Sequence, residues 1–429
     1  MGKTVSWTGS GPDPAPFAFA PAPGEVQGLV LRDGALSALS FGVYRFWMKT
    51  HLRALIWRRT ALAGDPFEYD GTPTELLRGA LIAIVALSIG LLAFNLALAW
   101  AGLALWDSWS PGLSVVFSAA ALAPVVEFAR FAARRYRLRR TRWRGLRFGM
   151  DGAAATHLRI WLFWSLVMIL TLGLARPWLR VARERYLTLS MLYGDARFGF
   201  EGRAHAIFRE WLATWLAALV AFAAIVILRR VIVVVSVHGV RFDVMSFVTP
   251  LLALALGWMV FRFWCAYRAA ELSLFMSARR VRGLRVSCAF AAEGLLRPAR
   301  AVVGRAILGG AALAAMLIAF ATLMLRLAVA AEGGDPADFA LSVDLSLLGR
   351  FQTLPGRGLF LFTAWINYAA TALFLMWLWE AIWRPRVHAA LMAASAASGL
   401  ESLSDIRQRP EERAIMAEGF ADALDVAGL

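Results

Sequence analysis

Residues 76–105 read LLRGALIAIVALSIGLLAFNLALAWAGLAL, and this run contains a single charged residue, Arg78. About 20 apolar residues in a helix cross a hydrocarbon core of about 30 Å, so the stretch predicts a membrane-spanning helix. The composition agrees, because 60% of the 429 residues are hydrophobic, against roughly 45–50% in ordinary soluble domains. A soluble globular protein is therefore excluded.

Apolar runs recur along the chain and predict six spans. The spans are residues 76–105, 113–128, 211–228, 247–267, 303–325 and 359–382. Two further apolar stretches, 29–47 and 158–178, are interpreted as re-entrant or interfacial helices that break near Gly42 and Gly173. If both stretches crossed fully, the topology would have eight spans instead.

Arginine gives the predicted orientation. Residues 130–147 hold nine arginines and no acid, whereas residues 330–344 carry four acidic residues. Basic loops stay in the cytoplasm, which places both termini there. The expected partner is anionic lipid, and nucleic acid is disfavoured because the arginines directly follow a span. The predicted headgroup contacts are Arg134, Arg135, Arg139, Arg140 and Arg144.

Residue pairs 131 positions apart indicate an internal duplication. The clearest pairs are Gly42 with Gly173, Arg45 with Arg176, Trp47 with Trp178, Phe67 with Phe198 and Gly71 with Gly202. A weaker similarity links residues 59–71 with 140–152, and residues 144–147 with 282–285. These pairs predict an all-α fold of two related modules, each an apolar helix, a basic helix and an aromatic–glycine turn.

The pattern divides the chain into consecutive segments. We expect a disordered tail (1–27), membrane module 1 (28–152), membrane module 2 (153–290), a C-terminal transmembrane hairpin (291–390) and a cytoplasmic tail (391–429).

Four segments carry a family resemblance. They are SFGVYRFWMK at 40–49, TALAGDPFEYDGT at 60–72, RTRWRGLRF at 140–148 and TLGLARPW at 171–178. The sequence resembles the YjgN family of bacterial inner-membrane proteins, a domain of unknown function. The resemblance implies an inner-membrane location and no known activity.

The repeated aromatic and cationic residues are the candidate ligand site. Tyr44, Trp47, Lys49, Arg176, Trp178, Arg180 and Tyr186 would frame a cytoplasmic vestibule for an anionic or amphiphilic molecule. The alternative is that they anchor helices at the headgroup level. Asn95 and Asn367 lie inside predicted spans, where they serve either an interhelical hydrogen bond or a polar pathway.

The sequence offers no catalytic motif. Its five histidines and two cysteines show no metal-ligand spacing, and no nucleophile elbow is present. We therefore expect no enzyme, no cofactor and no metal. The leading hypothesis is transport or permeation of a small anionic or amphiphilic solute. The alternative is a noncatalytic membrane scaffold or lipid-organising protein, and no particular protein partner is indicated.

Overall fold

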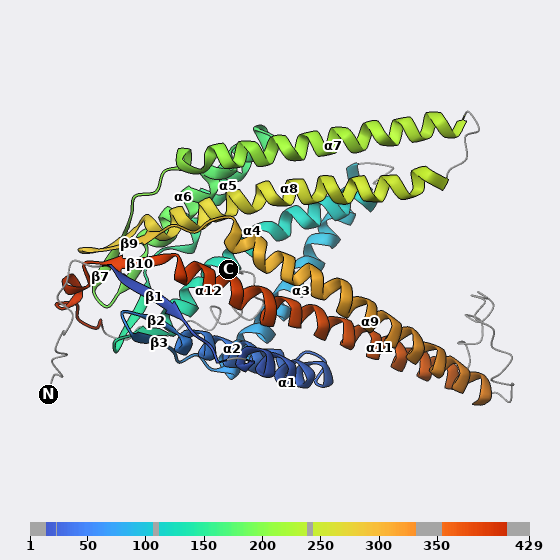
Figure 1. The fold of residues 1–429 in the computed structure, drawn as a ribbon, viewed down its shortest axis with the longest axis horizontal. Coiled ribbons are helices and arrows are strands. Elements are labelled where there is room, and N and C mark those ends of the chain that lie inside the picture. The colour runs from blue at the N-terminus through green and yellow to red at the C-terminus, as the bar shows by residue number, and fades with distance from the viewer. Residues whose placement is uncertain (1–13, 23, 106–110, 238–242, 332–353, 410–429) are drawn as a thin grey trace. The chain divides into compact units, whose positions relative to one another are not determined.

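The computed structural model describes residues 14–22, 24–105, 111–237, 243–331 and 354–409 (Figure 1). They form two compact units. The first contains residues 14–20, 53–296 and 388–409, and the second contains residues 21–52 and 297–387. Each unit is therefore discontinuous in the sequence, whereas the predicted modules are consecutive.

The predicted all-α fold is wrong, because ten short strands of the first unit close into an antiparallel barrel. The strands are β1 (Ala15–Phe19), β2 (Thr60–Leu62), β3 (Asp65–Tyr69), β4 (Thr141–Trp143), β5 (Leu146–Met150), β6 (Met191–Tyr193), β7 (Ala196–Phe200), β8 (Arg279–Val281), β9 (Leu284–Cys288) and β10 (Ser395–Ser398). Strands of three to five residues are shorter than the runs from which alternation is read, so the helical pattern of their neighbours dominates the sequence.

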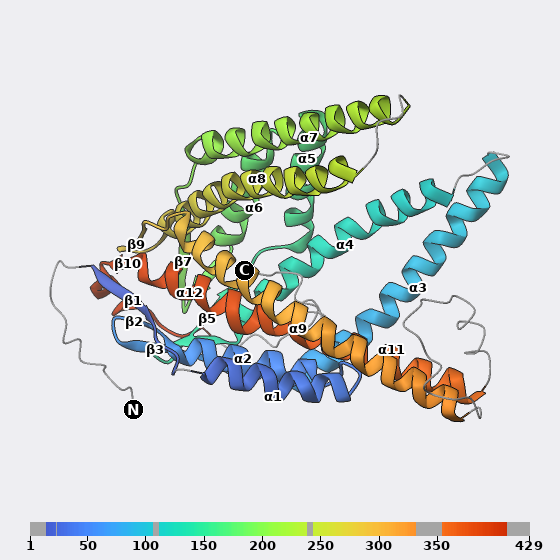
Figure 2. The ribbon, with the colours of Figure 1, turned by 45° about the vertical axis from the view of Figure 1, so that its right-hand side comes forward.

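Long helices separate the hairpins along the chain. They are α1 (Glu25–Leu39), α2 (Arg45–Arg59), α3 (Pro73–Leu105), α4 (Pro111–Arg139), α5 (Ala154–Leu170), α6 (Arg176–Leu189), α7 (Phe208–Val237), α8 (Asp243–Ser277), α9 (Glu293–Ala331), α11 (Leu354–Met376) and α12 (Arg384–Ala393). Short helical turns are η1 (Ala204–Ile207), the π-helical η3 (Trp377–Trp383) and η4 (Leu400–Leu403). Figures 1 and 2 show α7 and α8 side by side, running away from the strands.

The barrel consists of five two-stranded ribbons. Four are hairpins, β2–β3, β4–β5, β6–β7 and β8–β9, and the fifth pairs β10 with β1 from opposite ends of the chain. β1 also pairs with β2, and this contact completes the closure. Strand β1 lies in the segment predicted as a disordered tail, and β10 lies in the predicted cytoplasmic tail. The described parts of both tails are thus structured.

The same hydrogen bond recurs at each seam, the place where the second strand of one ribbon meets the first strand of the next. The residue that follows the second strand of one ribbon donates its N–H to the carbonyl of the residue that precedes the first strand of the next ribbon. The five bonds are Ala20 to Arg59 (3.2 Å), Asp70 to Arg140 (3.0 Å), Asp151 to Ser190 (2.9 Å), Glu201 to Ala278 (3.0 Å) and Ala289 to Ala394 (2.9 Å). The seams can therefore be compared position by position.

Side chains fill the barrel interior. Phe67 stacks on Trp143 with ring centroids 6.0 Å apart, and Phe148 meets Tyr193 at 4.9 Å. Leu403 and Ile406, which follow β10, belong to the same buried cluster. Large aromatic groups supply most of the apolar area that such short strands bury.

The hairpins turn through two residues, which requires left-handed backbone. Arg144 and Gly145 have φ of 51° and 78°, and Ala63 and Gly64 have 53° and 83°. Positive φ at both positions matches the right-handed twist of the flanking strands. The aromatic–glycine turn of the sequence analysis thus lies beside β-hairpins.

The predicted helix breaks are present. α1 ends at Leu39 and α5 ends at Leu170, each before a left-handed pair that includes Gly42 (φ 89°) or Gly173 (φ 90°). Glycine adopts this conformation without steric cost. In the second unit, Gly34 of α1 lies against Met376 and Leu373 at a separation that a Cβ atom would not fit.

Five helical segments are long and apolar enough to cross a membrane. They are Pro73–Trp100, Ala204–Leu228, Thr249–Ser277, Glu293–Met324 and Leu361–Ala393. α4, which contains the predicted span 113–128, is not among the segments found in the described residues. The apolar surfaces of the five segments are mostly exposed. The protein is therefore membrane-associated.

Candidate functional site

Helix α6 presents several charged side chains to neighbouring elements of the first unit. Pro177 lies in its first turn, where the missing N–H costs no hydrogen bond and the fixed φ favours the helix. Leu179 and Val181 are buried. The remaining faces bring Arg180 and Glu184 towards α4, α8 and β8.

Glu184 is the centre of one ionic cluster. Its carboxylate accepts two hydrogen bonds from Arg134 of α4, both 2.9 Å long, and one of 2.7 Å from Arg279 of β8. Burial alone would raise the pKa of Glu184, but the two guanidinium groups outweigh burial and hold the pKa well below its usual value. The carboxylate therefore remains ionised and joins α4, α6 and the barrel.

Glu127 of α4 forms a second cluster. Its carboxylate lies 2.6 Å from Arg183, 3.1 Å from Arg130 and 2.9 Å from His157 Nε2 of α5. Burial lowers the pKa of Arg183 to about 10, although the charge of Glu127 opposes the shift. His157 is 1% exposed, and its Nδ1 makes no hydrogen bond.

The buried Glu271 of α8 pairs with Arg180 of α6 and Arg268 of its own helix. Sequence reasoning did not select Glu184, Glu271 or His157 as site residues. The available signal was the spacing of Arg180 and Glu184, which places opposite charges on one face of α6.

Arg176 differs from Arg180 and Arg183 of the same helix, which each pair with a carboxylate. Its guanidinium lies over the rings of Trp211 and Tyr267, at 5.1 and 5.9 Å from their centroids. Among the described residues, no carboxylate pairs with Arg176, and its buried Nε has no hydrogen-bond partner. The hydroxyl of Tyr267, a residue with 0% exposure, makes no hydrogen bond of ordinary geometry, although it lies against the Arg176 guanidinium. Two buried polar groups are thus unsatisfied beside one uncompensated cation.

The predicted vestibule residues of α6 contact separate partners. Trp178 packs against His205 and Phe208, while the Tyr186 hydroxyl donates to the Ala153 carbonyl. Tyr44, Trp47 and Lys49 belong to the second unit, where Tyr44 stacks on Trp47 at 5.7 Å and Lys49 is buried. A vestibule that combines both groups stays a prediction.

The predicted headgroup arginines contact groups of the chain itself. Arg134 bonds Glu184, as described above, and Arg135 donates to the Gly152 carbonyl. Arg140 pairs with Glu75, and Arg144 pairs with Asp65 across neighbouring turns. Arg139 is the last residue of α4. Lipid contact by these five arginines stays a prediction.

The two amide side chains that the sequence places inside predicted spans differ in their contacts. Asn95 accepts a hydrogen bond of 2.9 Å from Ser118, which links α3 and α4. This is the interhelical bond that the sequence left as one of two possibilities. Asn367 of α11 has a buried carbonyl oxygen without a partner.

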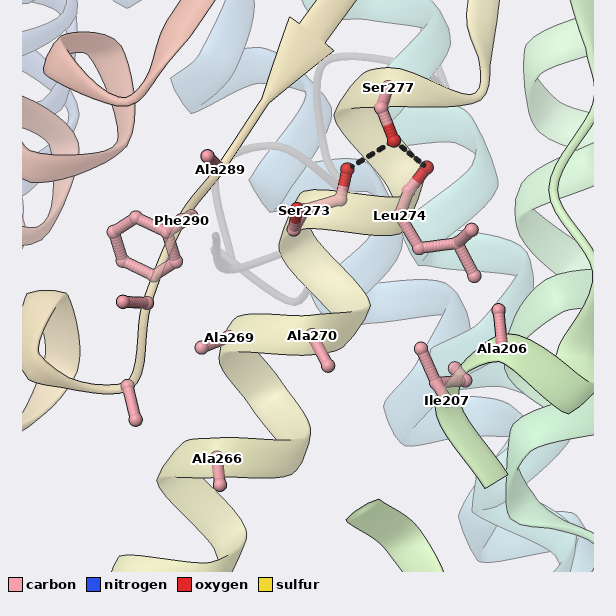
Figure 3. Close-up of a pocket in the computed structure, with 12 residues that line it drawn as sticks. Ala206, Ile207, Ala266, Ala269, Ala270, Ser273, Leu274, Ser277, Ala289 and Phe290 are labelled. Carbon is pink, nitrogen blue, oxygen red and sulfur yellow. Dashed lines mark hydrogen bonds between the residues drawn. The ribbon is translucent and has the colours of Figure 1, made fainter. Parts of the chain in front are cut away.

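A groove of about 530 Å³ lies along α8 in the first unit. Figure 3 shows α8 between Ala289 and Phe290 on one side and Ala206 and Ile207 on the other. Seven alanines, two serines, Ile207, Leu274 and Phe290 line it, so most of its wall is apolar. Its volume falls within the range of roughly 300–1,000 Å³ typical of small-molecule sites.

Among the charged residues of α6, Arg180, Arg183 and Glu184 form ion pairs with other elements. Among the residues that the structure describes, histidine, cysteine and acidic side chains form no cluster suited to a metal ion.

Comparison with known families places the chain. The model of a family described as bacterial protein of unknown function (DUF898) matches residues 14–423. The chain belongs to the DUF898 family. DUF898 is the YjgN family, so the resemblance found in the sequence is confirmed. No curated protein and no solved structure matches this DUF898 chain.

Proposed function

We propose that this DUF898 protein is a multi-pass protein of the bacterial inner membrane that transports a small anionic or amphiphilic solute. Both termini lie in the cytoplasm in this proposal, and the protein is not an enzyme. The proposal rests on Arg176, the first residue of α6, whose guanidinium lies over two aromatic rings that contact each other and has no carboxylate partner among the described residues.

The surroundings of Arg176 favour an anionic ligand. Arg180 and Arg183, on the same helix, are each matched by a buried carboxylate. Arg176 is partly buried, and a partly desolvated cation without such a partner favours the approach of a negative group. A phosphate or carboxylate of the solute would supply that charge and would accept hydrogen bonds from the Arg176 guanidinium, against which the Tyr267 hydroxyl lies.

The spans supply the membrane path. Tyr267 lies on α8, and Trp211 lies on α7, so two candidate membrane helices meet at the proposed anion site. The barrel does not serve as the conduit, because its interior is packed with aromatic side chains. The solute would therefore pass among the helices.

Native mass spectrometry of the protein released gently from lipid tests binding. We expect a bound anionic compound that is lost in Arg176→Gln. Arg185→Gln is the matched control, because Arg185 is an exposed arginine of the same helix. Equal retention of the compound by both variants would contradict a role for Arg176.

Transport is tested separately with the compound so identified. Cells that lack the protein should lose uptake or efflux of it, and wild-type protein but not Arg176→Gln should restore the flux. Unchanged flux in the deletion strain would exclude transport while leaving binding intact.

A noncatalytic lipid-organising scaffold is the second candidate. The packed barrel favours it, since strands from both ends of the chain are joined in one rigid element. Crosslinking in intact membranes should then recover a stoichiometric partner protein, and a consistently solitary protein would count against the scaffold.

We also propose that the 131-residue offset reflects duplication of a membrane module.

A further inference from the structure

One side of the groove along α8, formed by Ala206 and Ile207, lies at the β7–β8 seam, and this seam has a close structural counterpart at the β3–β4 seam. Phe67 pairs with Trp143 in one seam, and Phe198 pairs with Val281 in the other. The N–H of Asp70 bonds the carbonyl of Arg140 just as that of Glu201 bonds Ala278. Residues the same number of positions after β3 and β7, or before β4 and β8, therefore occupy comparable places in the two seams.

Polar side chains occupy the β3–β4 seam. Glu75 accepts a hydrogen bond of 2.9 Å from the Tyr136 hydroxyl, and the same carboxylate pairs with Arg140. Tyr136 is 2% exposed, so its ring occupies interior space. The β3–β4 seam therefore contains a carboxylate, a guanidinium group and an aromatic ring.

The β7–β8 seam has small or apolar residues at the matching positions. Ala206 stands where the first seam has Glu75, Leu274 stands where it has Tyr136, and Ala278 stands where it has Arg140. Ala206 and Leu274 both line the groove. The groove thus exists because these residues do not occupy the space that Tyr136 and Glu75 take in the other seam.

The groove wall suits a hydrocarbon chain. Ser277 donates to the Ser273 carbonyl at 2.8 Å (Figure 3). Ser273 donates to the Cys288 carbonyl at 2.5 Å, so both hydroxyl protons are already used. Alanine methyl groups and Leu274 form much of the remaining wall. Ala266, at one end, lies within the candidate span Thr249–Ser277, which makes the groove continuous with an exposed membrane helix.

Exposed cations flank the same groove. Arg203 and Arg209 lie on either side of η1, the turn that contributes Ala206 to the wall. The Arg209 side chain is 92% exposed even though it contacts Glu210. An apolar slot next to exposed cations complements a molecule with a hydrocarbon chain and an anionic headgroup.

We propose that this groove binds one acyl chain of an anionic membrane phospholipid, whose phosphate meets the cations beside η1. The site goes beyond the proposed function, because it lies at a barrel seam and does not use Arg176. It identifies a lipid ligand whether the protein acts as a transporter or as a scaffold.

The test compares phosphatidylglycerol with phosphatidylcholine of the same acyl chains, each added to the delipidated full-length protein and counted by native mass spectrometry. We expect the wild type to retain phosphatidylglycerol. The double variant Ala206→Glu/Leu274→Tyr, which reproduces the side chains of the first seam, should lower its occupancy roughly tenfold, equivalent to about 1.4 kcal/mol. Retention of phosphatidylglycerol by a folded double variant would overturn the proposal.

Three further measurements complete the design. Ala270→Leu narrows the groove with a single apolar change and replaces the double variant if that variant fails to fold. Arg203→Gln/Arg209→Gln should remove the preference for phosphatidylglycerol, and an unchanged preference would overturn the headgroup assignment. Arg176→Gln should bind phosphatidylglycerol normally, which separates this site from the proposed solute site. A polypeptide displaced by Ala270→Leu, with no change in lipid, would assign the groove to a protein partner and overturn the proposal.

Discussion

Glu184 shows how one residue joins separate elements in this protein. A buried carboxylate is costly unless charged donors replace its lost hydration. Arg134 and Arg279 provide three hydrogen bonds, one pair of which is bidentate, and they come from α4 and β8. Glu184 thus holds two elements to α6. They are α4, which precedes the β4–β5 hairpin, and β8, the first strand of the β8–β9 hairpin.

Replacing Glu184 with glutamine should destabilise the first unit by about 3–5 kcal/mol, because two half-buried guanidinium groups lose their counter-charge. Glu201→Gln is the control, since Glu201 pairs with Arg280 but its side chain is 59% exposed. An exposed pair contributes about 0–1 kcal/mol. Thermal unfolding in detergent gives the comparison, and equal midpoints for the two variants would refute the assigned role.

The same carboxylate should make stability depend on pH. The pKa of Glu184 in the folded protein lies below its usual value, because Arg134 and Arg279 outweigh the opposing effect of burial. Its contribution is therefore present above the ordinary glutamate pKa of about 4.3 and declines as the pH falls below that value. Unfolding midpoints measured from neutral to acidic pH should fall less steeply in Glu184→Gln than in the wild type.

At the scale of the element, each hairpin turn depends on left-handed backbone. Gly145 has φ of +78°, and a Cβ there would meet no atom within 4 Å, so only backbone strain opposes a side chain. Gly145→Ala should cost about 1–2 kcal/mol. Gly149→Ala in the following strand is the control, because a Cβ there makes ordinary contacts with Leu192 at 3.7 Å. Chemical denaturation should separate the two variants, and indistinguishable curves would contradict the turn assignment.

Elements also show what the sequence reveals and what it conceals. Long apolar helices could be predicted because 20 or more residues repeat one signal, and the breaks at Gly42 and Gly173 could be predicted from a glycine within each of two apolar stretches. The strands could not be predicted from the sequence. Residues 130–147 contain the end of α4 and most of a hairpin, yet their arginines suggest one basic helix. The ion pairs of Glu184 and Glu271 depend on long-range contacts that no local pattern contains.

At the scale of the whole molecule, closure of the barrel joins the two ends of the chain. β1 pairs with β10 through Ala15 and Pro16 and with β2 through Phe17, Ala18 and Phe19. Removal of β1 would leave two strand edges with unpaired backbone groups and would withdraw Phe17 from the barrel core. A short N-terminal segment is therefore required to complete an element formed mostly by residues far along the sequence.

Deletion of residues 1–19 should consequently open the barrel, whereas deletion of residues 1–12 should leave it closed. Hydrogen exchange is the measurement, because backbone amides of β2 and β10 lose their partners on β1 when the barrel opens. We expect faster exchange in β2 and β10 with little change in β5 and β6, which pair on the far side of the strand order. Uniform protection in the longer deletion would show that closure does not depend on β1, and equal loss in both deletions would assign the effect to residues before the strand.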